Sequence, residues 1–263
     1  MGAGRSGTSL TGLLLERAGY HVCVNSYQPD DGNPLGYFED LEVVQLNDAI
    51  LAPFYCSKWR RLLRSVSRKP NIVGTGAWLL DLDPSLLNAV RLRSDHADKF
   101  RELFAHTPFA YKDPRFSFTL GVLAPIIPKN TVYLCVFRHP LQVVESTKNH
   151  ALRSRIIVDD EYGFALWEAH YECLLQHYHE VGGQWLFISY ERLMNGEAFP
   201  RIEEFLGVRL DRGLAKRELM RTQTVGRLSG RVAEVYDRLN GLEEGSSIQP
   251  TPQESMFFGQ STG

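Results

Sequence analysis

A glycine-rich loop, Gly2-Ala3-Gly4-Arg5-Ser6-Gly7-Thr8-Ser9, stands at the start of this 263-residue chain, and an apolar stretch with helical spacing follows it directly. The glycines permit positive φ angles, so that successive N–H groups converge on one point, and the following helix adds its positive end. The loop predicts an anion-binding cradle, with an ordinary glycine-rich turn as the plain alternative. Such a cradle normally follows a buried strand. No strand-forming residues precede Met1, so we expect the first strand to be missing through a truncated or mis-assigned start.

Strand and helix patterns alternate along the rest of the chain. The segments with strand character are Tyr20–Val24, Pro108–Lys112, Thr131–Phe137 and Gln184–Ser189, and those with helix character are Ser9–Ala18, Leu41–Leu51, a stretch from about Pro140, and Tyr162–Val181. This alternation predicts a single P-loop-like α/β domain over residues 1–240, with a central parallel sheet flanked by helices. Residues 241–263 have few apolar side chains and are expected to form a mobile C-terminal tail.

The composition limits the possible partners and compartments. A formal net charge of -2 argues against a broad nucleic-acid surface, and any anion must be held by a local cluster. Four cysteines without metal-site spacing favour a reducing compartment, and the absence of a long apolar run argues against a membrane span. We therefore expect a soluble, cytoplasmic protein. The basic stretch Lys58–Lys69 is interpreted as a solvated helix face, with an anionic acceptor or a membrane surface as alternatives.

The loop differs from a triphosphate-binding loop at one decisive position. Four residues separate Gly2 from Gly7, as in a Walker A motif, but Thr8 stands where that motif has its lysine. Arg5 is placed to supply positive charge instead. The hydroxyls of Ser6, Thr8 and Ser9 are expected to act as further donors.

A second anion-binding pattern follows the strongest strand, where Phe137 is succeeded by Arg138-His139-Pro140 and the next predicted helix carries Ser146. An arginine at a strand end can hold a phosphate by a forked contact, and Ser146 can reach the same anion. The plain alternatives are an arginine that caps the sheet edge and an ordinary helical serine.

Taken together, these residues resemble the sulfotransferases that use 3′-phosphoadenosine 5′-phosphosulfate (PAPS), in the Arg-Ser-Gly-Thr loop variant common among bacterial and glycan-directed members. The resemblance implies that PAPS is the co-substrate and 3′-phosphoadenosine 5′-phosphate (PAP) the product. It further implies a 5′-phosphosulfate site, a 3′-phosphate site, a lysine at the transferred group and a tyrosine near the adenine. Gly4–Ser9 correspond to the 5′-phosphosulfate site, and Arg138 with Ser146 to the 3′-phosphate site. Lys112 corresponds to the lysine at the transferred group, and Tyr190 to the tyrosine near the adenine. A late Arg-Lys-Gly segment is absent, and Arg227 or Arg231 is the candidate substitute.

Sulfuryl transfer requires cations at the developing negative charge and a base for the acceptor hydroxyl, but in principle no metal. Arg5 and Lys112 are the candidates for the first role. Glu39 is the leading candidate for the base, because the resemblance places a glutamate after the first helix, and Asp113 is the second candidate. Asp113 alternatively holds Lys112 or Arg115 in place.

Two other functions remain possible at this stage. A non-catalytic PAPS- or PAP-binding protein would use the same loop, and a P-loop kinase is disfavoured by the missing lysine. The acceptor is expected to be a hydroxyl group on a carbohydrate, a lipid or another small molecule.

Overall fold

The computed structural model describes residues 1–30, 33, 35–54, 82–153, 157–215 and 226–245. The basic stretch Lys58–Lys69 lies outside these residues. The α-helices and strands, in chain order, are α1 (Thr8–Arg17), α2 (Leu41–Leu51), α4 (Ser94–Phe104), α5 (Phe116–Leu123), β1 (Val132–Phe137), α6 (Pro140–Arg153), α7 (Asp160–Glu180), β2 (Gln184–Ser189), α8 (Tyr190–Met194), α9 (Phe199–Leu206) and α10 (Gly230–Gly245). Short 3₁₀ segments cover Ala52–Phe54, Pro84–Ala89, Ala124–Ile126 and Arg212–Leu214.

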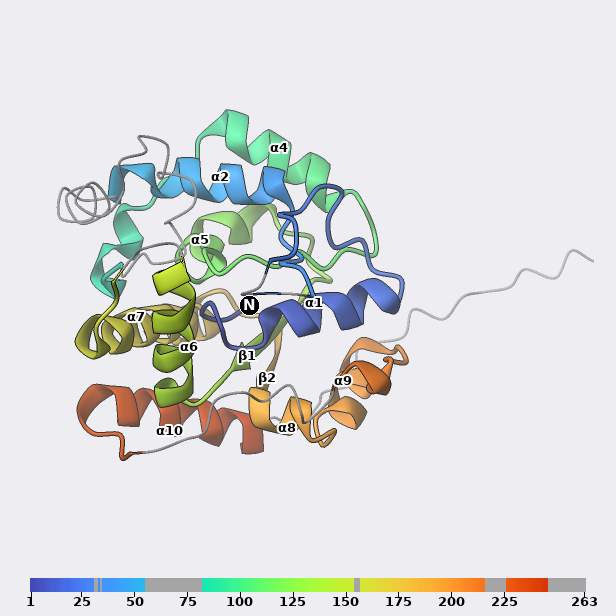
Figure 1. Ribbon diagram of the computed structural model, residues 1–263. Helices are drawn as coiled ribbons and strands as arrows, with labels where there is room; N and C mark the ends of the chain where they lie inside the picture. The colour runs from blue at the N-terminus through green and yellow to red at the C-terminus, as the bar shows by residue number, and fades with distance from the viewer. Residues whose placement is uncertain (31–32, 34, 55–81, 154–156, 216–225, 246–263) are drawn as a thin grey trace, which may run out of the picture.

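A parallel pair of strands, β1 and β2, lies at the centre of the molecule (Figure 1). Its register runs from Val132 opposite Gln184 to Phe137 opposite Ser189. Both strands are short apolar runs, as expected for parallel strands that are covered on both faces. The strands predicted at Thr131–Phe137 and Gln184–Ser189 are therefore confirmed.

Helices cover both faces of this sheet. On one face Cys135, Phe137 and Phe187 pack in one cluster with side chains of α7 and α10. On the other face Leu186 and Ile188 pack with α1, α8 and α9. Alternate side chains of a strand point to opposite faces, so the two strands supply both clusters. The described residues form an α/β fold in which a small parallel sheet is flanked by helices, as predicted.

The two weaker strand predictions are wrong. Tyr20–Val24 and Pro108–Lys112 meet only in one isolated parallel bridge, between His21 and Phe109. A strand in a parallel sheet is stabilised by neighbours on both sides. Residues 107–112 pair with the segment around His21 through one bridge. The same residues line a cavity, so a strand does not form there.

In the described residues no strand precedes the glycine-rich loop, but Met1 bonds to the edge of β1. Its amine donates to the carbonyl of Leu134 at 2.5 Å, and the N–H of Val136 donates to the Met1 carbonyl at 2.8 Å. These two bonds are those of one residue in a parallel ladder. The backbone of Met1 thus joins the loop to the edge of β1.

The C-terminal helix α10 continues past residue 240, where the mobile tail was expected to begin. It extends to Gly245, and the Glu243 side chain is buried. The Glu243 carboxylate accepts from the Ser189 N–H at 2.8 Å and from the Ser189 hydroxyl at 3.2 Å. Residues 241–245 are therefore packed on the end of β2, and the rest of the expected tail lies outside the described residues.

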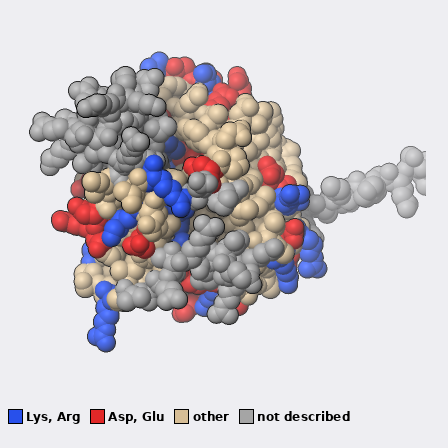
Figure 2. Space-filling model, in the orientation of Figure 1, with Lys and Arg blue, Asp and Glu red and all other residues tan. Residues whose placement is uncertain are grey.

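The surface shows no extended region of one charge on the face drawn in Figure 2, where basic and acidic side chains of the described residues are interspersed. Cys135 and Cys173 are buried free thiols, and Cys23 is half-buried. In the portion of the chain that the structure describes, no helix meets the length and hydropathy needed to cross a bilayer.

Candidate functional site

The glycine-rich loop curls back over the sheet through three residues with positive φ. These are Gly2 at 146°, Arg5 at 68° and Gly7 at 93°, and Gly7 is the N-cap residue of α1. A Cβ atom on Gly7 would lie 2.4 Å from the ring of Tyr190, so no side chain fits there without moving that ring. The conformation expected for an anion cradle at a helix N-terminus is present.

The Ser6 side chain has a different role from the one expected. Its hydroxyl is fully buried and lies 2.8 Å from the hydroxyl of Tyr171, which is also 2.9 Å from the carbonyl of Val136. The Ser6 hydroxyl therefore ties the loop to α7 and β1 and does not point to a ligand. From Ser6 only the backbone remains to contact an anion.

Arg5 and Ser146 come together, although 141 positions separate them in the sequence. Arg5 Nε donates to Ser146 Oγ at 3.1 Å, which connects the loop to α6. Burial lowers the pKa of Arg5, so the surroundings disfavour its charge unless an anion is present.

Arg138 lies beside this pair at the end of β1. Its Nε donates to Gln142 at 2.8 Å and its Nη1 donates to the Arg5 carbonyl at 3.3 Å, while its guanidinium lies 4.4 Å from the centre of the Tyr190 ring. Arg138 is 6% exposed and forms no ion pair with any carboxylate of the described residues. Burial lowers the pKa of Arg138, and the charges of Tyr190 and Glu191 oppose that effect. A buried cation without an ion-pair partner favours an external anion.

Lys112 and Glu39 form a buried ion pair on the other side of the loop. Lys112 Nζ lies 2.5 Å from Glu39 Oε1 and 2.8 Å from the carbonyl of Tyr37. It is also 3.4 Å from the hydroxyl of Ser9, in the first turn of α1. Glu39 stands directly before Asp40, whose side chain caps α2 by accepting from Glu42 N and Val43 N. The cap of α2 thus fixes the backbone beside Glu39.

Asp113 lies next to this pair in the sequence, but both of its carboxylate oxygens are occupied. Oδ1 accepts from Arg115 N and Arg115 Nη1 at 2.9 and 2.8 Å, and Oδ2 accepts from Asn47 at 3.0 Å. Arg115 also donates to Asp48 at 2.6 Å, and the nearby carboxylates raise the pKa of Arg115 despite its burial. Asp113 therefore holds Arg115, which was the alternative considered for it.

The residues that complete this network were not predicted from the sequence. Asn47 is fully buried on α2, where it donates to Asp113 and accepts from Thr119 at 2.8 Å. Only the sequence Asp113-Pro114-Arg115 carried a signal, because two opposite charges around a proline can pair locally. Asn47 and Asp48, which reach this segment from α2, showed no such pattern.

The two late arginines differ in their surroundings. Arg231 forms ion pairs with Glu172 and Glu234 on the surface of α7 and α10, which removes it from the site. Arg227 is exposed, and its neighbour Gly226 lies against Leu141 in the first turn of α6. That turn follows Arg138, so the chain beside Arg227 packs on the helix that starts at the anion-binding arginine.

The site therefore has two parts joined by the loop. One part contains Arg5, Arg138, Ser146 and Tyr190, and the other contains Ser9, Glu39 and Lys112. Among the described residues no group of His, Cys, Asp and Glu side chains could hold a metal ion. The arrangement can bind two anionic groups on one ligand and place a carboxylate and an ammonium beside one of them.

Comparison with known proteins adds a family to this geometry. The profile of the sulfotransferase family matches residues 1–212. Among solved structures, the chain is similar to the sulfotransferase domain of the olefin synthase from Synechococcus PCC 7002, with 19% identity, coverage of 91% of this chain and 92% of that domain, and a TM-score of 0.49. A comparison with curated proteins gave no match.

Proposed function

The chain belongs to the sulfotransferase family, and we propose that it transfers a sulfuryl group from PAPS to a hydroxyl acceptor, with Glu39 as the base. The observation that carries this proposal is the buried Glu39–Lys112 ion pair, which meets Ser9 at the N-terminus of the helix behind the anion cradle. In this proposal the pair supplies a proton acceptor and a cation at the end of the cradle where the transferred group lies.

Donor binding uses the part of the site that contains the two buried arginines. Arg138 and Ser146 hold the 3′-phosphate, and Arg5 with the loop N–H groups holds the 5′-phosphosulfate. The proposal is supported by the contact of Arg5 with both Ser146 and Arg138, which makes the two anion sites adjacent. Tyr190 lies against Gly7 and under Arg138, where an adenine would pass. Arg227 adds a third contact to the 3′-phosphate.

The chemical step uses the Glu39–Lys112 part. PAPS supplies an activated sulfur–oxygen bond, which breaks as the acceptor oxygen bonds to sulfur, and PAP leaves. Glu39 accepts the proton of the acceptor hydroxyl. Lys112 and Arg5 stabilise the negative charge that develops on the transferred group and on the leaving phosphate oxygen. No residue of the chain forms a covalent bond in this scheme.

Asp113 takes a positioning role in this proposal. Both of its oxygens accept hydrogen bonds from buried partners, Arg115 and Asn47, so its carboxylate serves to hold these residues in the proposed arrangement. Through its hydrogen bond to Asn47, Asp113 holds the segment after Lys112 against α2. Helix α2 begins next to Glu39, so this contact positions Lys112 relative to Glu39.

The proposal is tested by transfer of labelled sulfuryl from PAPS to a panel of hydroxyl acceptors that includes sugars, lipid alcohols and phenols. We expect transfer to at least one acceptor class and saturable binding of PAP. Binding of PAP with no transfer to any member of a broad panel would favour a non-catalytic binding protein. Preferential binding of ATP would refute the proposal.

A further inference from the structure

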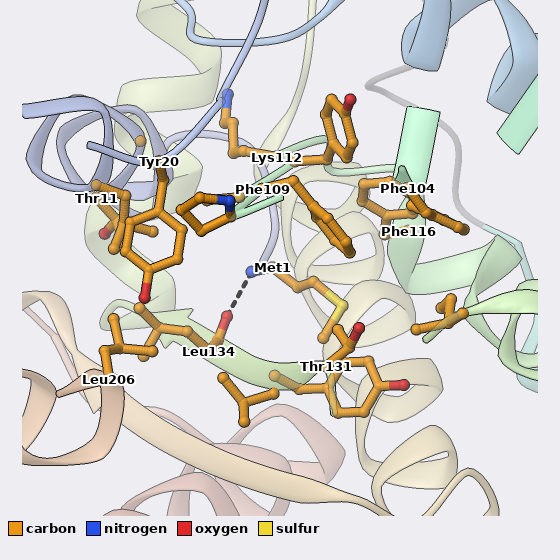
Figure 3. A pocket seen from close by; sticks show the side chains of 18 of the residues that line it. Met1, Thr11, Tyr20, Phe104, Phe109, Lys112, Phe116, Thr131, Leu134 and Leu206 are labelled. Atoms are coloured by element: carbon orange, nitrogen blue, oxygen red, sulfur yellow. Dashed lines mark hydrogen bonds between the residues drawn. The ribbon is translucent and has the colours of Figure 1, made fainter. Parts of the chain in front are cut away.

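A buried carboxylate that the proposed mechanism does not use lies where the two strands end. Glu191 is the second residue of α8, directly after β2. Both of its carboxylate oxygens are shielded from solvent, and no described residue forms a hydrogen bond of ordinary geometry with them. The cavity drawn in Figure 3 borders the first part of β1 and does not include this carboxylate. Burying an acceptor without a partner costs free energy, and such groups concentrate where a protein uses the charge.

The strand register brings Glu191 close to the anion-binding arginine. β1 and β2 end at opposite positions, so the residues that follow them leave the sheet side by side. Tyr190 accordingly lies against Arg138, with the guanidinium 4.4 Å from the centre of the ring. One position further along both chains, the Glu191 carboxylate faces the N–H of His139. Glu191 is therefore the neighbour of the residue that supports Arg138.

Glu191 and Arg138 influence each other's charge without forming a direct ion pair. Burial raises the pKa of Glu191, while the neighbouring N–H groups and the charge of Arg138 oppose that rise. Burial lowers the pKa of Arg138, and the charge of Glu191 is among those that oppose this effect. An anion that binds to Arg138 therefore acts on Glu191 as well.

The remaining titratable groups around Glu191 are neutral or already paired. They are Tyr171 on α7, Tyr236 and Glu243 on α10, Arg192 on α8 and His139 before α6. Burial raises the pKa of both tyrosines and lowers the pKa of the imidazole, so these three side chains are neutral at pH 7. Arg192 and Glu243 approach each other to 3.8 Å. Among the described residues, Arg138 is thus the cation to which Glu191 responds.

We propose that Glu191 opposes anion binding at Arg138 and takes up a proton when a phosphate binds there, so that it limits how tightly the protein holds PAP. A dianion beside Arg138 cancels the charge that keeps Glu191 ionised and adds a repulsive charge of its own. The free energy of protonating the carboxylate is then lost from binding. A limited affinity allows the product to leave after each transfer. The identity of the ligand, PAP, rests on the proposed function, whereas the effect of an anion on Glu191 does not.

The test compares the unmodified protein with Glu191→Gln, which keeps the size of the side chain and removes its charge. Dissociation constants for PAP are measured by calorimetry from about pH 5 to about pH 8.5. The ratio of the constants of the two proteins cancels the titration of the ligand's own phosphates. Inorganic sulfate, which stays a dianion over this range, is the second ligand, and its binding is followed by NMR at the Tyr190 ring. Glu197→Gln makes the same charge change at an exposed position and is the matched control.

We expect Glu191→Gln to bind both ligands about three- to tenfold more tightly than the unmodified protein at the upper end of this pH range. The advantage should shrink toward pH 5, because the carboxylate of the unmodified protein then becomes protonated as well. The Glu197 variant should bind as the unmodified protein does. An affinity ratio that does not change with pH would overturn the inference. Weaker binding by Glu191→Gln at every pH would also overturn it and would indicate a structural role at the start of α6.

The two ligands separate this inference from the proposed function. The expected pH profile with sulfate, but no binding of PAP, would support the role of Glu191 and refute the donor. Binding of PAP with a flat ratio would do the reverse, and binding of neither ligand would overturn both. If Glu191→Gln does not fold, the carboxyl ¹³C resonances of the unmodified protein decide. A glutamate whose pKa rises when PAP or sulfate binds would support the inference, and the absence of any such glutamate would overturn it.

Discussion

The two parts of the candidate site neutralise their cations in opposite ways. Lys112 has its own carboxylate in Glu39, at 2.5 Å, so this part is electrically complete without a ligand. Arg138 is equally buried, but its contacts are an amide side chain, a carbonyl and the face of an aromatic ring. A region that lacks a counter-charge is suited to tight binding of an anion, whereas an internally paired region is suited to exchanging protons and charge during a reaction.

The largest effect on activity is expected in the Glu39–Lys112 part of the site. Replacing Glu39 by glutamine should lower turnover by about a hundredfold to ten-thousandfold, because the base is lost. Affinity for PAP should stay within about twofold, since Glu39 does not contact the donor phosphates in the proposed arrangement. Steady-state kinetics and calorimetry measure the two quantities. Glu42→Gln, on the exposed first turn of α2, is the matched control. Full activity of the Glu39 variant would show that another residue acts as the base.

Asp113→Asn separates positioning from catalysis beside the same pair. Removing the Asp113 charge should cost about 1–3 kcal/mol, because buried Arg115 loses one of its two carboxylate partners and keeps only Asp48. Urea unfolding should show this loss, and Asp95→Asn, which breaks an exposed pair with Arg93, should show little change. An Asp113 variant with unchanged stability and no turnover would instead identify Asp113 as the base.

On the unpaired side, Arg138→Ala should weaken PAP binding by roughly tenfold to a hundredfold, as loss of a charge-assisted phosphate contact does. Arg231→Ala is the control, because that arginine is already paired with Glu172 and Glu234. Calorimetric titration with PAP measures both. Unchanged PAP affinity in the Arg138 variant would contradict the assignment of anion binding to the part of the site that contains Arg138.

A smaller effect on PAP affinity is expected from replacing the Tyr190 ring, which lies against the Arg138 guanidinium. Tyr190→Leu removes an aromatic face worth about 1 kcal/mol to a nearby guanidinium, so PAP affinity should fall about fivefold. Tyr190→Phe keeps the face and should bind PAP as the parent does. Equal loss in both variants would point to the hydroxyl rather than to the ring.

The smallest change is a titration shift. Burial and the charge of Arg5 lower the pKa of His150 to about 4, so its imidazole is neutral at pH 7. An anion bound near Arg5 favours the charged imidazolium and should raise this pKa. NMR titration of the ring with and without PAP measures the shift. His177, also at about 4 but buried against the Ser117 carbonyl, should not move, and a His150 value that PAP leaves unchanged would argue against an anion at Arg5.

The sequence was informative where the signal is local. The apolar run before Arg138 predicted β1 and put an arginine at its end, and the glycines predicted a curled loop at a helix N-terminus. The strands expected near Tyr20 and Pro108 failed, because strand pairing depends on neighbours and only a single bridge forms there. β-propensity reflects such surroundings more than the residue itself.

The chemistry of the site was also predictable only where it depends on residue type and on position in the sequence. Residue types and positions in the sequence indicated that Arg5, Lys112, Glu39 and Arg138 belong to one site. They did not reveal that Ser6 turns its hydroxyl to Tyr171, because Tyr171 lies 165 positions away. They also left the role of Asp113 open, since the decisive partner, Asn47, comes from another helix.

The contact between Gly7 and the Tyr190 ring has a consequence for ligand selection. Both Gly7 and the guanidinium of Arg138 lie against the Tyr190 ring, so a change in the size of this ring shifts the loop and the arginine relative to each other. In the proposed arrangement these two elements bind the two anionic groups of the donor. The Tyr190 ring then helps to set the distance between charged groups that a ligand must match.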